Sequence, residues 1–246
     1  MKEKILFEKK TKEELAEFIN KNKERKIINF LDAHTIFHSA NNKSFKKCFT
    51  NKNSINCIDG FPISFFLSIK SMKRIPRNRG PTFTRYFLNS EYSKNAKHFF
   101  IGLSEKDHKL LKSKLPHLKY TYCYNPPYIK DIRFPESEIN NMASKINKVN
   151  PDYVWVGIGS PKQNILSREL FETKAKYFIN IGAALDFLLG KKEEAPLFIR
   201  EMGIEWFYRL IKDFKYSYKK VLRAFIAMRY LNTIDIVDNK KFTYNF

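Results

Sequence analysis

Residues Tyr153–Gln163 read YVWVGIGSPKQ and join a short apolar strand, a glycine turn and the start of a helix. Valine and aromatic residues favour the strand, while Gly157 and Gly159 allow the backbone to approach another group closely. Ser160 is a good N-cap residue and Pro161 suits the first helical position, so the sequence predicts a helix that begins here. A strand followed at once by a helix is the unit from which parallel α/β sheets are built.

The same alternation extends along the chain. A capping box formed by Thr11 and Glu14 marks an early helix, and further helices are expected at 104–115 and 137–149. We expect strands at Lys26–Leu31, Asn56–Asp59, His98–Leu103, Lys119–Tyr124, Tyr153–Gly157 and Tyr177–Ile181. This rhythm predicts an α/β, Rossmann-like fold with a mainly parallel sheet and helices on both faces. Ligands of such sheets bind beyond the carboxyl ends of the strands.

The sequence changes character near residue 200. Apolar residues between 207 and 225 recur with a helical period, and most other positions there are basic. Residues 206–231 hold seven Lys and Arg against one Asp, a net charge of +6, and the last fifteen residues show no clear pattern. We therefore predict a catalytic domain over 1–200 and a basic, amphipathic helical appendage over 201–246 that associates with an anionic membrane surface.

The composition limits the class of protein. With 43% hydrophobic residues among 246, the chain has enough apolar material for a sizeable core. Its 46 Lys and Arg against 25 Asp and Glu give a net charge of +21, which suits nucleic acid, an acidic membrane or phosphorylated substrates. An AT-rich genome explains part of this lysine excess, so charge alone does not choose among them.

Cysteine usage and hydropathy add two expectations. Cys48, Cys57 and Cys123 are widely spaced and form no CxxC pair, which favours a reducing compartment and buried apolar roles. The first residues have no signal-peptide core, and the longest apolar run, Phe61 to Ile69, is shorter than the roughly 18 residues of a membrane span. We expect a soluble or peripheral protein.

The glycine turn could bind an anion. The N-terminus of a helix offers free N–H groups and the positive end of a dipole, and Lys162 and Gln163 fall in its first turn. The alternative is a plain strand–turn–helix junction, which is common.

Two further segments could carry chemistry. In CIDGFP, Asp59 ends a strand and precedes Gly60, where a carboxylate could take a proton from a hydroxyl group; simple turn chemistry is the alternative. In IGAALDFLLG, Gly182 and Ala183 permit close approach to a ligand. For Asp186, in the same segment, we favour a structural ion pair, with Arg200 or Arg209 as the partner.

Taken together these motifs resemble one family. GIGSPKQ, IGAALDFLLG, Ala195-Pro196 and GIEWFYRL, in this order and spacing, are similar to the WecG/TagA/CpsF glycosyltransferases, glycosyltransferase family twenty-six. The Asp-Gly of CIDGFP and the Arg77-x-x-Gly80 element match as well, so the resemblance covers roughly residues 25–230. Several ordered motifs are more specific than any one alone.

The resemblance implies an activity. Members are inverting enzymes that need no metal and no cofactor, and they work in the cytoplasm, peripheral at the inner face of the bacterial membrane. Their donor is a UDP-sugar, such as UDP-N-acetylmannosamine, and their acceptor a polyprenyl-diphosphate-linked glycan of teichoic acid, capsule, exopolysaccharide or common antigen. The oligomeric state stays open, with a homo-oligomer among the possibilities.

The resemblance also assigns residues. Asp59 matches the general base, and Arg77 and Gln163 match residues that bind the donor's phosphate or sugar. The turn with Gly157, Gly159, Ser160 and Lys162, joined by Arg77 and Arg209, is expected to neutralise the departing UDP.

Two departures from the family pattern fall near the sugar pocket. Phe30 and Asp32 stand where the family has Thr-x-Asn, and Thr82 stands where it often has Asp. These differences predict an altered donor sugar, with an inactive member as the alternative.

Other interpretations are disfavoured. A nucleic-acid-binding module would need a basic aromatic strand face rather than glycine turns, so no nucleic-acid partner is expected. A non-catalytic scaffold in a glycan assembly complex remains an alternative. His34 and His38 share a helical face near Asp32, but the sequence shows no third ligand, so no metal site is predicted.

Overall fold

The structure is a computed structural model of the chain, and it describes residues 4–212, 218, 222, 226 and 234–237. Its centre is a six-stranded sheet in the order β3-β2-β7-β6-β4-β5, with every neighbouring pair parallel. The strands are β2 (Lys26–Leu31), β3 (Ser54–Ile58), β4 (Lys97–Ile101), β5 (Tyr120–Tyr124), β6 (Tyr153–Val156) and β7 (Tyr177–Asn180). The α/β prediction and all six predicted strands are confirmed, with ends that differ by at most two residues.

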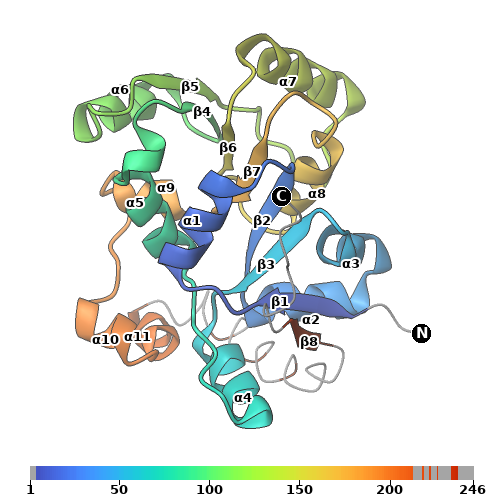
Figure 1. Cartoon of the computed structure of the whole chain (residues 1–246), viewed down its shortest axis with the longest axis vertical. Coiled ribbons are helices and arrows are strands. Elements are labelled where there is room, and N and C mark those ends of the chain that lie inside the picture. Colours follow the sequence, from blue (N-terminus) through green and yellow to red (C-terminus); the bar gives the residue numbers. More distant parts are fainter. Residues whose placement is uncertain (1–3, 213–217, 219–221, 223–225, 227–233, 238–246) are drawn as a thin grey trace.

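Helices cover both faces of the sheet (Figure 1). They are α1 (Lys12–Lys21), α2 (Ala33–Asn41), α3 (Lys43–Thr50), α4 (Phe61–Ser71), α5 (Gly80–Leu88), α6 (Glu105–Lys114), α7 (Glu136–Val149), α8 (Lys162–Glu169), α9 (Ala184–Leu188), α10 (Leu197–Glu201) and α11 (Glu205–Lys212). Buried residues of α1, α5, α6 and α9 pack on one face, and those of α7 and α8 pack on the other. The connection from β3 to β4, which contains α4 and α5, crosses from one edge of the sheet to its other half.

The helix starts test the capping predictions. The capping box of Thr11 and Glu14 is present at α1, and the Ser104 side chain caps α6. The prediction for Ser160 and Pro161 was wrong: α8 begins at Lys162, and no side chain caps it. Pro161 is the residue that precedes the first helical position, and its peptide bond with Ser160 is cis.

A second, two-stranded sheet joins the two ends of the described chain. β1 (Ile5–Glu8) pairs in parallel with β8 (Ile234–Val237). The last fifteen residues show no clear pattern in the sequence, yet a strand forms there through a partner more than two hundred residues away. Of the amphipathic helix predicted after residue 204, α11 is described, and most of the remainder lies outside the described residues.

A ladder of buried asparagines crosses the centre of the sheet. Asn29 of β2 lies beside Asn56 of β3 and Asn180 of β7 in register. Its Oδ1 accepts hydrogen bonds from Asn180 Nδ2 at 2.8 Å and from Asn164 Nδ2 of α8 at 2.9 Å, and its own Nδ2 donates to Asn56. Ser167 Oγ of α8 donates to Asn180. These bonds fix α8 against the sheet, because buried amides that lose their partners are costly.

Among the residues that the structure describes, no helix combines the length and the apolar character needed to cross a bilayer.

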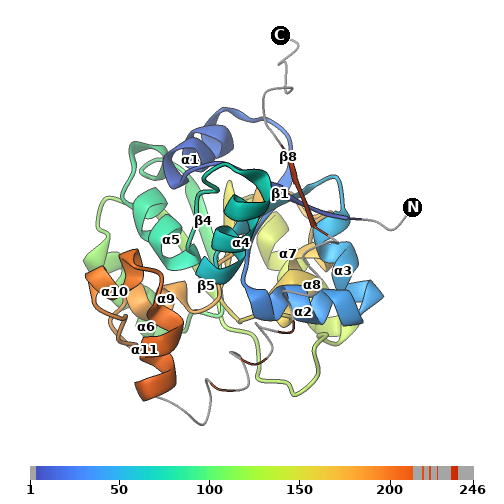
Figure 2. The same ribbon diagram turned by 90° about the horizontal axis from the view of Figure 1, so that it is seen from below.

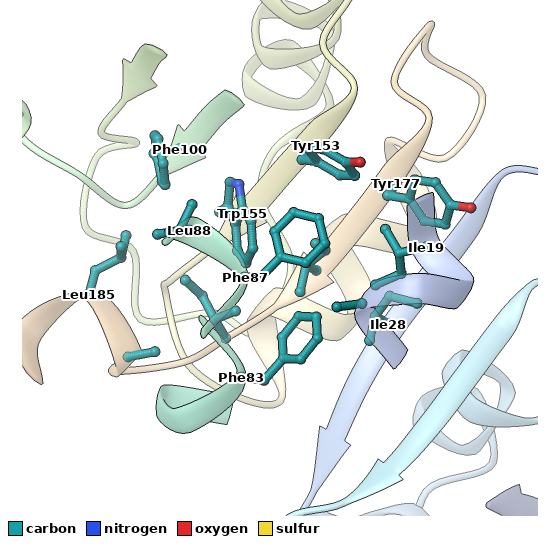
Figure 3. Packing of buried hydrophobic residues seen from close by; sticks show 14 of the residues in the cluster. Ile19, Ile28, Phe83, Phe87, Leu88, Phe100, Tyr153, Trp155, Tyr177 and Leu185 are labelled. Carbon is teal, nitrogen blue, oxygen red and sulfur yellow. The ribbon is translucent and has the colours of Figure 1, made fainter. Parts of the chain in front are cut away.

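Aromatic packing dominates the core beneath α5 (Figure 3). Phe87 is fully buried and meets Tyr153 edge-on at 5.0 Å between ring centroids, with Trp155 at 5.7 Å. We predict that Phe87→Ala lowers the free energy of unfolding by about 3–5 kcal/mol, since it removes this apolar contact and leaves a cavity. Phe65→Ala, at an exposed position of α4, is the matched control and should cost less than about 1 kcal/mol. Urea denaturation measures both, and equal losses would contradict the assignment of Phe87 to the core.

Candidate active site at the carboxyl edge of the sheet

Asp59 follows β3 directly and stands at the carboxyl edge of the sheet. Its backbone N–H donates to Leu31 O, and its Oδ2 accepts the Gly80 N–H at 3.4 Å. Its carbonyl oxygen accepts from Arg77 Nε at 2.7 Å. The side chain is half-buried. The carboxylate is therefore held at the edge where parallel sheets bind ligands.

The environment of Asp59 favours its protonated form. Burial raises the pKa of Asp59 from 3.8 to about 6, and the neighbouring carboxylate of Asp32 adds to the rise. Arg77, Arg79 and the Gly80 N–H oppose it. A carboxylate with a pKa close to neutrality suits a general base, because it is ionised at working pH yet still takes up a proton.

Arg77 belongs to a cluster of arginines and glutamates. Its Nη2 donates to Glu205 Oε2 at 3.1 Å and its Nη1 to the carbonyl of Arg200. Arg79 donates to the other Glu205 oxygen at 2.8 Å. Glu194 pairs with Arg85 and Arg200, both at 2.8 Å. Four guanidinium groups thus share two carboxylates, which leaves the cluster with a net positive charge beside Asp59.

The predicted glycine turns meet on the neighbouring strand ends. Gln163 is buried, and its Oε1 accepts the Gly182 N–H at 2.9 Å. A Cβ at Gly157 would lie 3.3 Å from Gly182 O, so these two turns touch. A Cβ at Gly80 would lie 3.6 Å from the carbonyl of Ile181. Contacts therefore run from Asp59 through Gly80 and Gly182 to the 157–163 turn.

The other predicted residues of the turns are placed differently. Gly159 has φ +84° with open space at its α-carbon, and Ser160 is exposed, so both face solvent. Lys162 Nζ instead donates to Ile129 O at 2.6 Å and lies over the Tyr128 ring. Ala183 is half-buried just before α9. The Lys162 ammonium is therefore occupied within the protein.

The residues that depart from the family pattern have structural contacts. Asp32 caps α2, with Oδ1 accepting from the backbone and the hydroxyl of Thr35. Phe30 packs on Phe83 at 5.3 Å between ring centroids. Thr82 Oγ1 accepts from Arg79 at 3.1 Å.

The expected partner of Asp186 was wrong. Asp186 pairs with Lys192 at 2.5 Å, because the chain after α9 turns back beside it, while Arg200 bonds Glu194. The predicted structural ion pair is confirmed. The Arg209 side chain lies outside the described part of the chain, so its predicted role at the UDP stays a prediction.

Arg79, Glu194 and Glu205 join the site without having been predicted from the sequence. Arg79 lies inside the Arg77-x-x-Gly80 element, and Glu205 inside GIEWFYRL, so both stood in the quoted motifs. Only the fold shows that these segments, more than a hundred residues apart, meet.

Possible metal ligands form two groups. His34 and His38 share α2 as expected, with their Nε2 atoms 3.2 Å apart. In the described residues one group of three, Glu105, His108 and Cys123, brings its ligand atoms within 4.8 Å. Cys123 of that group belongs to β5, which forms the edge of the sheet opposite to β3.

The burial of the cysteines was also predicted. Cys48 and Cys57 are buried as expected, whereas Cys123 is only half-buried.

Fold and site define a Rossmann-like α/β protein with a carboxylate, an arginine cluster and paired glycine turns at one edge of its sheet. The model of the glycosyl transferase WecG/TagA/CpsF family matches residues 4–240. The chain belongs to this family, and the resemblance found in its motifs is confirmed.

Curated relatives carry more specific names. The chain is 28% identical over 134 residues to the N-acetylglucosaminyldiphosphoundecaprenol N-acetyl-beta-D-mannosaminyltransferase of Staphylococcus aureus strain MRSA252, an alignment that covers 52% of this chain and 49% of the relative. The enzyme of the same name from strain MW2 is 29% identical over 107 residues, or 43% of this chain and 39% of the relative. The matches thus span about half, or less, of the length of these relatives.

The raised pKa of Asp59 makes stability depend on pH. Between about pH 4 and pH 6 the unfolded carboxyl group ionises before the folded one, so the contribution of Asp59 to stability falls as pH rises through this window. Asp59→Asn removes the titration. The free energy of unfolding of the variant, minus that of wild type, should therefore increase by at most about 3 kcal/mol from the lower to the upper end of the window. Urea denaturation across the window measures the difference, and a constant difference would contradict the raised pKa.

Proposed function

We propose that this chain is an inverting glycosyltransferase that moves an N-acetylmannosamine-like sugar or a related hexose from a UDP-sugar to a polyprenyl-diphosphate-linked glycan. The observation that carries the proposal is the half-buried Asp59, with a pKa near 6, beside a net positive arginine cluster. The family match supports the reaction class. The names of the staphylococcal relatives support the sugar and the lipid-linked acceptor.

The proposed reaction is a single displacement. Asp59 takes the proton of an acceptor hydroxyl group, the hydroxyl oxygen attacks the anomeric carbon of the donor, and the bond to UDP breaks with inversion. The leaving diphosphate gains negative charge as this bond breaks. Arg77, Arg79 and the 157–163 turn stabilise that charge through the positive field at this edge of the sheet.

The location follows from the acceptor. A polyprenyl tail stays in the bilayer, so the enzyme works as a peripheral protein at the inner face of the cell membrane. Within this proposal residues 1–200 carry the chemistry and 201–246 assist at the membrane. We expect the donor's sugar to bind near Phe30, Asp32 and Thr82, so these residues would set the choice of donor.

The test is a transfer assay with a short-chain acceptor. Asp59→Asn should lower turnover by roughly 10²–10⁴ while UDP still raises the melting temperature, because the base is lost but the diphosphate contacts remain. Asp152→Asn, the same change at the amino end of β6, is the control and should keep its activity. In wild type, kcat/KM should rise with pH through about 6, as Asp59 loses its proton.

Three results would contradict the proposal. Near-normal turnover of Asp59→Asn removes the base. Absence of stabilisation by UDP, with none from other nucleotides, favours the scaffold alternative. Stabilisation by oligonucleotides instead of UDP favours nucleic-acid binding.

Metal independence is a separate prediction. Arginines and backbone N–H groups take the place of a cation at the leaving diphosphate, so turnover should be unchanged by EDTA. A strict requirement for Mg²⁺ or Mn²⁺ would contradict this. The variants His34→Ala and Cys123→Ser would then show which of the two ligand groups holds the ion.

A further inference from the structure

Helix α4 presents an apolar stripe to solvent. Phe65 and Ile69 are four residues apart and lie along one side of the helix, and Met72 follows as its C-cap residue; the three are 55%, 62% and 93% exposed. The opposite side, with Ile63 and Leu67, packs into the core. The helix is therefore held on the core by its buried side, and the exposed stripe is apolar although it contributes little to this packing. Such exposed patches mark interaction sites.

The exposed charges on and just after α4 are all positive, while Arg77, Arg79 and Arg85 further along the chain pair with Glu194 and Glu205. Residues 60–90 contain six Lys and Arg and no Asp or Glu. Three of the six, Lys70, Lys73 and Arg74, are exposed at the end of α4, next to Met72. An apolar stripe flanked by cations is the composition of helices that lie in the interface of an anionic bilayer.

Helix α10 extends the apolar surface. Leu197, Phe198 and Met202 are each more than half exposed. The turn after α10 packs directly on the start of α4, since a Cβ at Gly203 would lie only 2.1 Å from the ring of Phe61. In Figure 1 α4, α10 and α11 lie in the lower part of the molecule, and Figure 2, seen from below, shows α10 and α11 to one side of α4.

We propose that this surface, the α4–α10 face, docks on a lipid bilayer that contains anionic lipid. The side chains of the stripe enter the boundary between headgroups and acyl chains, and Lys70, Lys73 and Arg74 meet the headgroup phosphates. The proposal rests on the proposed function in one respect: a lipid-linked acceptor requires the site to reach a membrane. It places the contact on α4 and α10, in addition to the basic segment after residue 204.

Charge argues against a second copy as the occupant. In a twofold dimer the same patch faces itself, so the exposed cations of one α4 would meet those of the other, with no acid in residues 60–90 to balance them. Anionic lipid supplies the complementary charge.

The test is vesicle flotation of the full chain with three variants. In Phe65→Ser/Ile69→Ser/Met72→Ser the stripe is removed; all three positions are exposed, so the melting temperature should stay near that of wild type. Leu110→Ser/Tyr120→Ser, exposed on α6 and β5, is the matched control. Lys70→Gln/Arg74→Gln changes charge alone.

The expected results separate apolar insertion from electrostatic attraction to the headgroups. On phosphatidylcholine vesicles with added phosphatidylglycerol, the stripe variant should bind at least about tenfold more weakly than wild type, and the control should bind equally. The charge variant should lose the preference for phosphatidylglycerol over pure phosphatidylcholine. A tryptophan placed by Met72→Trp should be quenched by brominated lipid beyond the quenching of wild type.

Activity distinguishes this proposal from the proposed function. The stripe variant should keep wild-type turnover on a short-chain, water-soluble acceptor and lose turnover on a long-chain acceptor in vesicles. If wild type transfers sugar to neither acceptor, the proposed function fails, and flotation still decides the docking proposal.

Two results overturn the docking proposal. One is equal flotation of wild type and stripe variant, or no flotation of either. The other is a stripe variant whose sedimentation mass falls while its vesicle binding is unchanged, which would make the α4–α10 face an interface between copies.

Discussion

One oxygen atom at the centre of the sheet, Oδ1 of Asn29, constrains much of the structure. It is fully buried and accepts hydrogen bonds from Asn164 and Asn180, so α8, β2 and β7 are tied to one point. A slip of β2 by one residue would turn Asn29 to the other face of the sheet, where it would lose both donors. A buried amide without partners costs about 1–3 kcal/mol, which disfavours other registers.

The asparagine ladder reaches the site through adjacent residues. Asn164 follows Gln163 in α8, so the bond that anchors the helix also sets where the Gln163 side chain can point. Gln163 in turn holds the Gly182 N–H, and Gly182 touches the 157–163 turn. A hydrogen bond deep in the sheet thus fixes the positions of two glycine turns at its carboxyl edge. The sequence motif GIGSPKQ keeps its shape partly because of an asparagine one residue beyond it.

Much of the fold could be predicted, because strands such as Tyr153–Val156 are short apolar runs next to glycine turns, and both signals are local. The pairing of β1 with β8 could not, since a four-residue strand gains its stability from a distant partner. Asp59 was predicted from its place at a strand end, but its raised pKa depends on burial in the fold and on the approach of Asp32, which outweigh the opposing arginines. The predicted partner of Asp186 was wrong because Lys192, six residues further along the chain, forms the ion pair instead.

The stripe on α4 shows a second limit. The run from Phe61 to Ile69 is apolar, and periodicity alone does not say which side of such a helix is covered. The structure decides this: Ile63 and Leu67 are buried, and Phe65 and Ile69 are exposed. The absence of acids from 60 to 90 was visible in the sequence, but it gained meaning only when the exposed side was known.

The connection from β3 to β4 holds the residues of three proposed roles in a short length of chain. It begins with Asp59, continues through the exposed stripe of α4 and returns to Arg77 and Arg79. Because α4 starts two residues after Asp59 and has eleven residues, its far end lies about 16 Å from its start. With the stripe in the headgroup layer, the carboxylate would stand within about that distance of the membrane surface, while the arginines lie beside it. An acceptor whose diphosphate sits at the headgroups could then present its terminal sugar to Asp59 without leaving the bilayer. The order of these residues in the chain would therefore couple the proposed base to the proposed docking surface.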